Sequence, residues 1–291
     1  LDASLFTPER WQNDPQLDHL QGIFHLAGAV QHTHKGSEPM WRTNVDGTLA
    51  MVRLAAAKKC RLIVLSTSGA IASFKTPTQR ADESGAFCLD TAGKLPYYAS
   101  KIAMEQQART LATELGVELI FIRPPVMLGP GDHRFRSTEK ILKLLRGKLP
   151  FLLRGGMHFI DIRDAAAAIV RAMTHPAPQP AYNLGGNAAQ GNVCSIDAFY
   201  RACAAEAGIT PRWRILPTPL LMGLAKLNST TGGKLAFIPD PVLIQMASYY
   251  WDVRSVYAER DLGYVTRDGG VTIRDTVQWL MQNHPDLMPS S

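Results

Sequence analysis

The stretch from Leu62 to Lys101 limits most strongly what this chain can fold into. The short apolar run Leu62–Leu65 contains β-branched residues and is followed by turn residues, which predicts a buried strand. Three hydroxyl residues, 66–68, stand where that strand would end. After a loop rich in Thr, Pro, Asp and Gly, the composition predicts a helix over 97–115. On this helix Tyr97 and Lys101 would share a face, because they are four residues apart.

A strand-end hydroxyl, a phenol and an ammonium group together suit redox exchange between an alcohol and a carbonyl. The phenol can carry the proton, and the ammonium can stabilise its deprotonated form. A Tyr four residues before a Lys is a weak signal by itself, because such pairs arise by chance. The rest of the chain therefore has to supply the context.

Strands and helices alternate over the first half of the chain. The expected order is a strand over 22–28, a helix over 39–59, the strand 62–65, the helix 97–115 and a strand over 117–122. This order predicts an α/β fold with a parallel sheet covered by helices on both faces. Two further strands are expected, at 159–162 and 181–186. Further helices are expected at 8–13, 138–146, 165–173, 195–207, 217–227, 239–250 and 271–282. Asp164 would cap the helix over 165–173.

The composition narrows the class of function. Hydrophobic residues make up 46% of the 291 residues and the net charge is +6, with Lys and Arg scattered along the chain, which argues against nucleic-acid binding. No secretory signal and no apolar run of about 18 residues is found, so we expect no membrane partner and a cytoplasmic location. The four cysteines form no Cys-x-x-Cys pair, and His32 and His34 lack a third ligand, so no metal site is expected.

Seven short segments, in this order along the chain, form a family pattern: His25-Leu26-Ala27-Gly28, Asn44-Val45-Asp46-Gly47-Thr48, Ser66-Thr67-Ser68, Tyr97-x-x-x-Lys101, Arg123-Pro124, Gly129-Pro130-Gly131-Asp132 and Phe159-Ile160-Asp161-Ile162-Arg163-Asp164. Through these segments the chain resembles the extended short-chain dehydrogenase/reductase family, also called NAD-dependent epimerases/dehydratases, from about Gly22 to Trp279. Ile71-Ala72-Ser73 replaces the Val-Tyr-Gly of many sugar-nucleotide epimerases, which is closer to the dihydroflavonol-reductase-like and hydroxysteroid-dehydrogenase-like branches.

The resemblance implies a Rossmann-like, doubly wound parallel sheet with a smaller, mostly helical C-terminal substrate domain. The dinucleotide-binding domain would comprise residues 1–128 and 157–187. The substrate-binding domain would comprise residues 129–156 and 188–291. The family's Gly-x-x-Gly-x-x-Gly turn is not found before Gly22, where a strand, glycine turn and helix of roughly 30 residues would not fit. We therefore expect the N-terminal βαβ unit to be absent from this chain and the cofactor domain to be incomplete.

The resemblance also assigns roles to single residues. Tyr97 would be the general base in oxidation and the acid in reduction, and Lys101 would lower its pKa and bind the nicotinamide ribose. Ser68 would bind the substrate oxygen, and Asn44 would complete a proton relay through water. The cofactor would be NAD or NADP. Residues implied to contact it are Leu26, Ala27, Gly28, Ser66, Thr67, Tyr97, Lys101, Arg123, Pro124 and Val126.

Several alternatives stay open. Tyr98 competes with Tyr97 as the phenol, Ser66 or Thr67 could replace Ser68, and Asn44 could be a plain hydrogen bonder on its helix. Arg163-Asp164 fits a helix start as well as a site, and the apolar C-terminal patches fit a core as well as a hydrophobic substrate pocket.

The leading function is that of an NAD(P)-dependent oxidoreductase or epimerase acting on a small secondary alcohol or ketone. A dinucleotide-binding regulator on the same fold and a truncated, cofactor-incompetent fragment are the alternatives. The resemblance also implies that a homodimer could form through helices 39–59 and 97–115.

Overall fold

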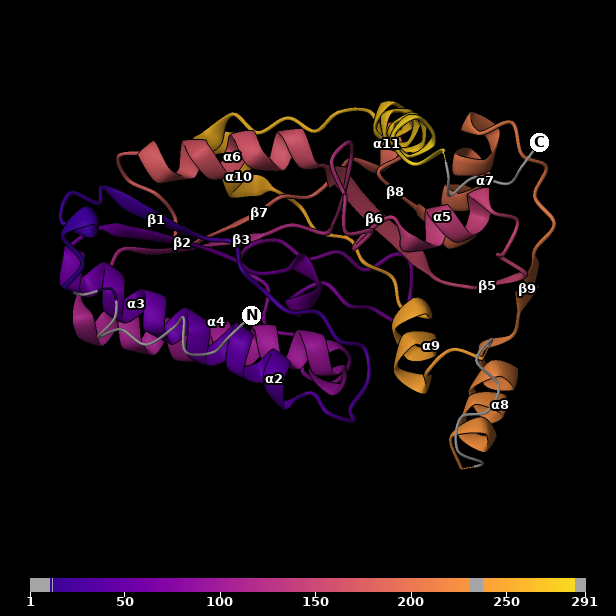
Figure 1. The fold of residues 1–291 in the computed structure, drawn as a ribbon, viewed down its shortest axis with the longest axis horizontal. Coiled ribbons are helices and arrows are strands. Elements are labelled where there is room, and N and C mark those ends of the chain that lie inside the picture. The colour runs from indigo at the N-terminus through magenta and orange to yellow at the C-terminus, as the bar shows by residue number, and fades with distance from the viewer. Residues whose placement is uncertain (1–10, 12, 231–237, 286–291) are drawn as a thin grey trace.

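The computed structural model describes residues 11, 13–230 and 238–285. A four-stranded parallel sheet forms one half of the described structure, with the strand order β1-β2-β3-β7 (Figure 1). Its strands are β1 (Gly22–His25), β2 (Arg61–Leu65), β3 (Leu119–Arg123) and β7 (Ala181–Asn183). All three neighbouring pairs run parallel, so the carboxyl ends of the strands meet at one edge, as the alternation of elements predicted.

Helices cover both faces of this sheet (Figure 1). On one face, α3 (Gly47–Lys58) and α4 (Pro96–Leu115) pack on Leu62, Val64 and Phe121. On the other face, α6 (Ile162–Thr174) and α10 (Val256–Leu262) pack on Ile63 and Tyr182. Successive residues of a strand point to opposite faces, so β2 supplies both cores. The α/β prediction with helices on both faces is confirmed.

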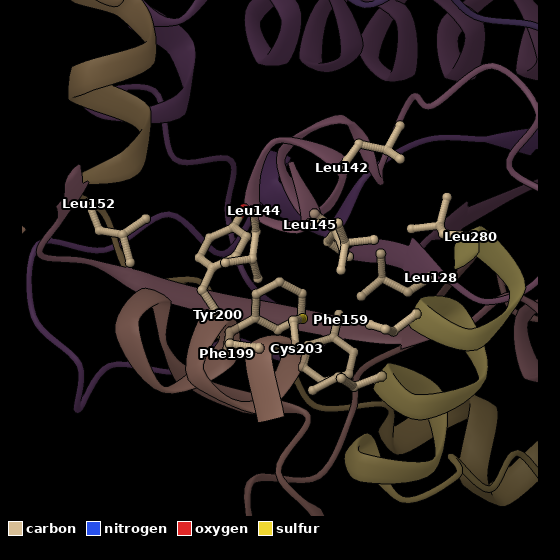
Figure 2. Packing of buried hydrophobic residues seen from close by; sticks show 14 residues of the cluster. Leu128, Leu142, Leu144, Leu145, Leu152, Phe159, Phe199, Tyr200, Cys203 and Leu280 are labelled. Atoms are coloured by element: carbon tan, nitrogen blue, oxygen red, sulfur yellow. The ribbon is translucent and has the colours of Figure 1, made fainter. Parts of the chain in front are cut away.

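The other half is built around short strands and helices (Figure 1). Figure 2 shows its main core, in which Leu128 and Phe159 pack with side chains of three helices, among them Leu145, Phe199 and Leu280. The elements are β4 (Val126–Leu128), α5 (Glu139–Leu145), β5 (Phe151–Leu153), β6 (Gly156–Asp161), β8 (Val193–Ser195), α7 (Ile196–Glu206), β9 (Arg214–Leu216), α8 (Thr218–Thr230), α9 (Pro241–Ala247) and α11 (Gly269–Asn283).

Most predicted helices are present, with bounds that differ by a few residues. The predicted helix over 39–59 consists of α2 (Glu38–Trp41), a π-helical turn at Arg42–Asp46 and α3. The prediction that Asp164 caps the helix over 165–173 is wrong. Asp161 is the cap, its carboxylate accepting from the Arg163 amide at 2.9 Å.

Short elements escaped sequence reasoning. Helix α10 has seven residues, and β4, β5, β8 and β9 have three each, too few to show a periodicity. The expected helix over 8–13 falls largely outside the described residues. Within the described ranges, no helix combines the length and the apolar character that crossing a bilayer requires.

Candidate active site

The hydroxyl residues predicted at the end of β2 lie at the carboxyl edge of the sheet. Thr67 caps a short 3₁₀ turn over Ser68–Ala70, with its hydroxyl accepting from the Gly69 amide at 3.3 Å. The Ser68 amide donates to the Pro124 carbonyl at 2.9 Å, which joins the ends of β2 and β3. Thr67 and Ser68 are both buried. Their hydrogen bonds to Gly69 and Pro124 hold this segment in place.

Lys101 reaches the same strand end from helix α4. Its ammonium donates to the Leu65 carbonyl at 2.8 Å, and the side chain is buried. A Cβ added at Gly28 would lie 3.5 Å from this ammonium, so the loop after β1 also passes close to it. Burial lowers the pKa of Lys101 to about 8, against the opposing effect of the Glu105 charge. The lysine is therefore mostly charged at neutral pH.

Tyr97 also faces the end of β2. Burial raises the pKa of Tyr97 to about 12, against the opposing effect of the nearby Thr67 side chain. The rings of His32 and Tyr98 meet the Tyr97 ring edge-on, at centroid distances of 6.0 and 5.0 Å. Sequence reasoning expected a lowered pKa, and the structure gives the opposite direction because desolvation outweighs the effect of Thr67. A phenol in this setting is a proton donor at neutral pH.

Tyr98 points to a different place. Its ring stacks on Trp251 at a centroid distance of 5.0 Å and an angle of 24°. An added Cβ at Gly69 would lie only 2.3 Å from the Tyr98 ring, so the ring packs directly on that glycine. The two neighbouring phenols thus have different surroundings: Tyr97 lies near Thr67, and the Tyr98 ring stacks on Trp251.

Asn44 joins the π-helical turn to two other segments. Its side-chain oxygen accepts from the Ala29 amide at 2.8 Å, and its side-chain nitrogen donates to the Ala29 carbonyl at 3.0 Å and to the Ser100 hydroxyl at 2.9 Å. The Ser100 hydroxyl in turn donates to the Tyr97 carbonyl at 2.7 Å. Both amide hydrogens of Asn44 are therefore used within the protein, and the residue links the loop after β1 to the first turn of α4.

Ser66 and Arg123 meet at a buried carboxylate that sequence reasoning missed. The Ser66 hydroxyl donates to Glu105 at 2.6 Å, and Arg123 donates to both oxygens of Glu105 at 2.9 and 2.6 Å. The available signal was a carboxylate four residues after Lys101, on the same face of the helix.

The edge of the sheet also presents apolar side chains to solvent. Leu26, just after β1, is 49% exposed, and Val126, the first residue of β4, is 39% exposed. Ala27 and Gly28 continue the same loop, and Gly28 is exposed. Exposed apolar groups beside buried polar ones fit a ligand with a planar ring system, because such ligands bind on mostly apolar walls with a few placed polar groups.

Comparisons with known proteins point to one family. The sequence model of the NAD-dependent epimerase/dehydratase family matches residues 3–185. A putative dihydroflavonol 4-reductase from Synechocystis sp. is 29% identical over 278 residues, covering 92% of this chain and 78% of the relative. Cinnamoyl-CoA reductase 1 from Arabidopsis thaliana is 30% identical over 181 residues, which cover 59% of this chain and 51%, or about half, of that relative.

A solved structure shares the fold. The UDP-glucuronic acid 4-epimerase from Bacillus cereus, in complex with NAD, superimposes with a TM-score of 0.72 at 14% sequence identity, covering 98% of this chain and 78% of the other. At this identity the likeness concerns the fold, and it agrees with the Rossmann-like architecture expected from the sequence.

Proposed function

Since the chain belongs to the NAD-dependent epimerase/dehydratase family, we propose that it is an NAD(P)-dependent oxidoreductase that interconverts a ketone and a secondary alcohol. One observation carries the proposal. The Lys101 ammonium binds the Leu65 carbonyl at the end of β2, and the Tyr97 phenol interacts with Thr67 at the same strand end. The name of the Synechocystis relative supports a reductase rather than an epimerase.

In the reductive direction, Tyr97 donates its hydroxyl proton to the substrate oxygen. Its pKa of about 12 keeps the proton in place at neutral pH until the carbonyl oxygen gains charge. The Lys101 ammonium then stabilises the phenolate that remains, and the Ser68 or Thr67 hydroxyl donates a hydrogen bond to the same oxygen. When bound, the nicotinamide cofactor supplies the hydride to the carbonyl carbon. In oxidation the proton returns to Tyr97.

The residues at the edge of the sheet fit NAD or NADP. We assign the ring contacts to Leu26 and Val126, whose apolar side chains are exposed there, and a close backbone approach to Ala27 and Gly28. The other residues that we propose to contact the cofactor are Thr67, Pro124, Tyr97 and Lys101. In this proposal, 1–128 and 157–187 bind the cofactor and 129–156 and 188–291 bind the substrate.

Replacing each of the two neighbouring phenols tests the proposal. Tyr97→Phe should lower kcat for the reduction of a dihydroflavonol, followed by NAD(P)H absorbance, by about 10²- to 10⁴-fold, because the proton donor is lost. Tyr98→Phe is the matched control and should keep turnover within a few-fold, since phenylalanine keeps the ring that stacks on Trp251 and the Tyr98 hydroxyl is not the proposed proton donor. Full turnover in Tyr97→Phe would refute the mechanism.

Titration with NADH separates this proposal from the two alternatives. Tight binding of NADH with no turnover of any ketone would favour a dinucleotide-sensing regulator on the same fold. Failure to bind NADH or NADPH would favour a fragment without cofactor affinity.

A further inference from the structure

Glu105 is a fully buried carboxylate in the middle of helix α4. It accepts hydrogen bonds from Ser66 and Arg123, and Arg109 lies 3.4 Å away on the next turn of the helix. A charge removed from water is costly unless it is paired and hydrogen-bonded. Here the fork of Arg123 binds both oxygens of the carboxylate, the geometry in which such a pair is strongest.

This carboxylate and Lys101 bind neighbouring groups of the same strand. Lys101 holds the Leu65 carbonyl at 2.8 Å, and Glu105, one helical turn further on, holds the Ser66 hydroxyl at 2.6 Å. The next residue along the chain, Thr67, lies near enough to Tyr97 to affect its pKa. Helix α4 is therefore hydrogen-bonded to the end of β2 at two consecutive residues, and the same helix carries both Tyr97 and the carboxylate.

Arg123 extends this attachment to the neighbouring strand. It is the last residue of β3, and it is buried against Glu105. Pro124, directly after it, accepts the Ser68 amide. Glu105 thus connects α4 with the ends of both strands whose following residues form the candidate site.

The charge of Glu105 also acts on Lys101. Burial alone favours the neutral amine, and Glu105 is the charged group that opposes this effect. Other charged or titratable groups around the pair include Arg109 on α4 and Arg123 on β3, which contact Glu105, and also Tyr97 on α4 and His25 on β1. Burial lowers the pKa of His25 to about 4, so it is neutral at pH 7.

We propose that Glu105 is a positioning residue of the active site, which holds the ends of β2 and β3 against helix α4 and keeps the buried Lys101 ammonium charged. This inference rests on the proposed function for its catalytic meaning. Its structural part concerns contacts that exist whether or not the protein turns over a ketone.

The test is the titration of Lys101 by NMR of its Cε and Nζ resonances, assigned by their loss in Lys101→Arg. The wild-type midpoint is expected near pH 8. In Glu105→Gln, which has the same shape without the charge, the midpoint should fall by about one pH unit. Glu114→Gln removes an exposed carboxylate from the same helix and should leave the midpoint unchanged.

A double variant separates electrostatics from loss of fold. Glu105→Gln leaves the Arg123 guanidinium buried without its partner, which should lower the urea midpoint of unfolding. Glu105→Leu combined with Arg123→Met removes both charges and should recover much of that loss, while Lys101 still titrates at the lowered pH. An unchanged Lys101 midpoint in Glu105→Gln, or an equal shift in Glu114→Gln, would overturn the inference.

Activity provides the second readout. If the proposed function holds, Glu105→Gln should move the rise of kcat/KM for alcohol oxidation to higher pH, because a neutral Lys101 no longer stabilises the Tyr97 phenolate. A uniform loss at every pH would indicate a structural role only and would count against the inference. Absence of all turnover in the wild type would refute the proposed function and leave the NMR test of Glu105 intact.

Discussion

Gly69→Ala adds a single methyl group beside the candidate site. The added Cβ would lie 2.3 and 2.8 Å from two carbons of the Tyr98 ring and 3.0 Å from Trp251. Carbon atoms in contact prefer roughly 3.5–4.0 Å, so the ring overlaps the methyl group by about 1 Å and has to move. Gly69 has no positive φ, so the backbone itself tolerates alanine.

The expected cost follows from overpacking. Inserting a methyl group into a packed site costs about 1–3 kcal/mol, which changes the ratio of folded to unfolded protein roughly 5- to 160-fold. The free energy of unfolding, measured with urea, should fall by that amount. Turnover should fall too, because the displaced Tyr98 ring packs edge-on against Tyr97 at 5.0 Å.

The same substitution at Gly223 is the matched control. Gly223 lies within α8 and no atom would contact the added methyl group within 4 Å, so Gly223→Ala should stabilise the protein by about 0.5–1 kcal/mol. In a Tyr98→Ala background the cost of Gly69→Ala should largely disappear, which a double-mutant cycle measures. Unfolding free energies of Gly69→Ala and wild type within about 0.5 kcal/mol would refute the steric argument.

Two further predictions concern stability. Lys59 ends α3 with a φ of 51°, so Lys59→Gly should raise the free energy of unfolding by about 1 kcal/mol, and a lower urea midpoint would contradict this. The pKa of buried His25 falls from 6.5 to about 4 on folding, so the unfolded chain binds the extra proton and stability is lost as pH falls from 6.5 toward 4. The free energy of unfolding should fall by about 3 kcal/mol over this range. His25→Gln should make the free energy of unfolding depend less on pH there, and buried His158, with a pKa of about 3, should account for the dependence that remains.

Sequence reasoning located the long elements because their signal is local. The run Leu62–Leu65 and the helix-forming stretch after Pro96 each carry their pattern within a few residues, and the structure places β2 and α4 there. The start of α6 was misplaced because Asp161 and Asp164 both fit a cap. Only the extended backbone of Asp161, with its φ of −78° and ψ of 134°, identifies it as the cap.

The roles of the site residues stay predictions, but the structure changes how they are distributed. Ser66 and Arg123 were expected to bind the cofactor, and the hydrogen bonds that the structure gives their side chains go to Glu105. Thr67 was an alternative to Ser68, and its side chain accepts from the Gly69 amide and lies near enough to Tyr97 to affect its pKa. The partners on helix α4 are not apparent from spacing, because each one joins a strand end to a different element of the fold.

From the amino-acid order alone, one can infer that Tyr97 and Lys101 share a helical face and that hydroxyl residues end the preceding strand. Both features depend on backbone geometry over a few residues. The choice between Tyr97 and Tyr98, the protonated state of the phenol and the partner of Arg123 depend on burial and on groups brought together by folding. Desolvation and hydrogen bonding act through space, so these properties exist only once β2, β3, α4 and the segment around Trp251 have packed together.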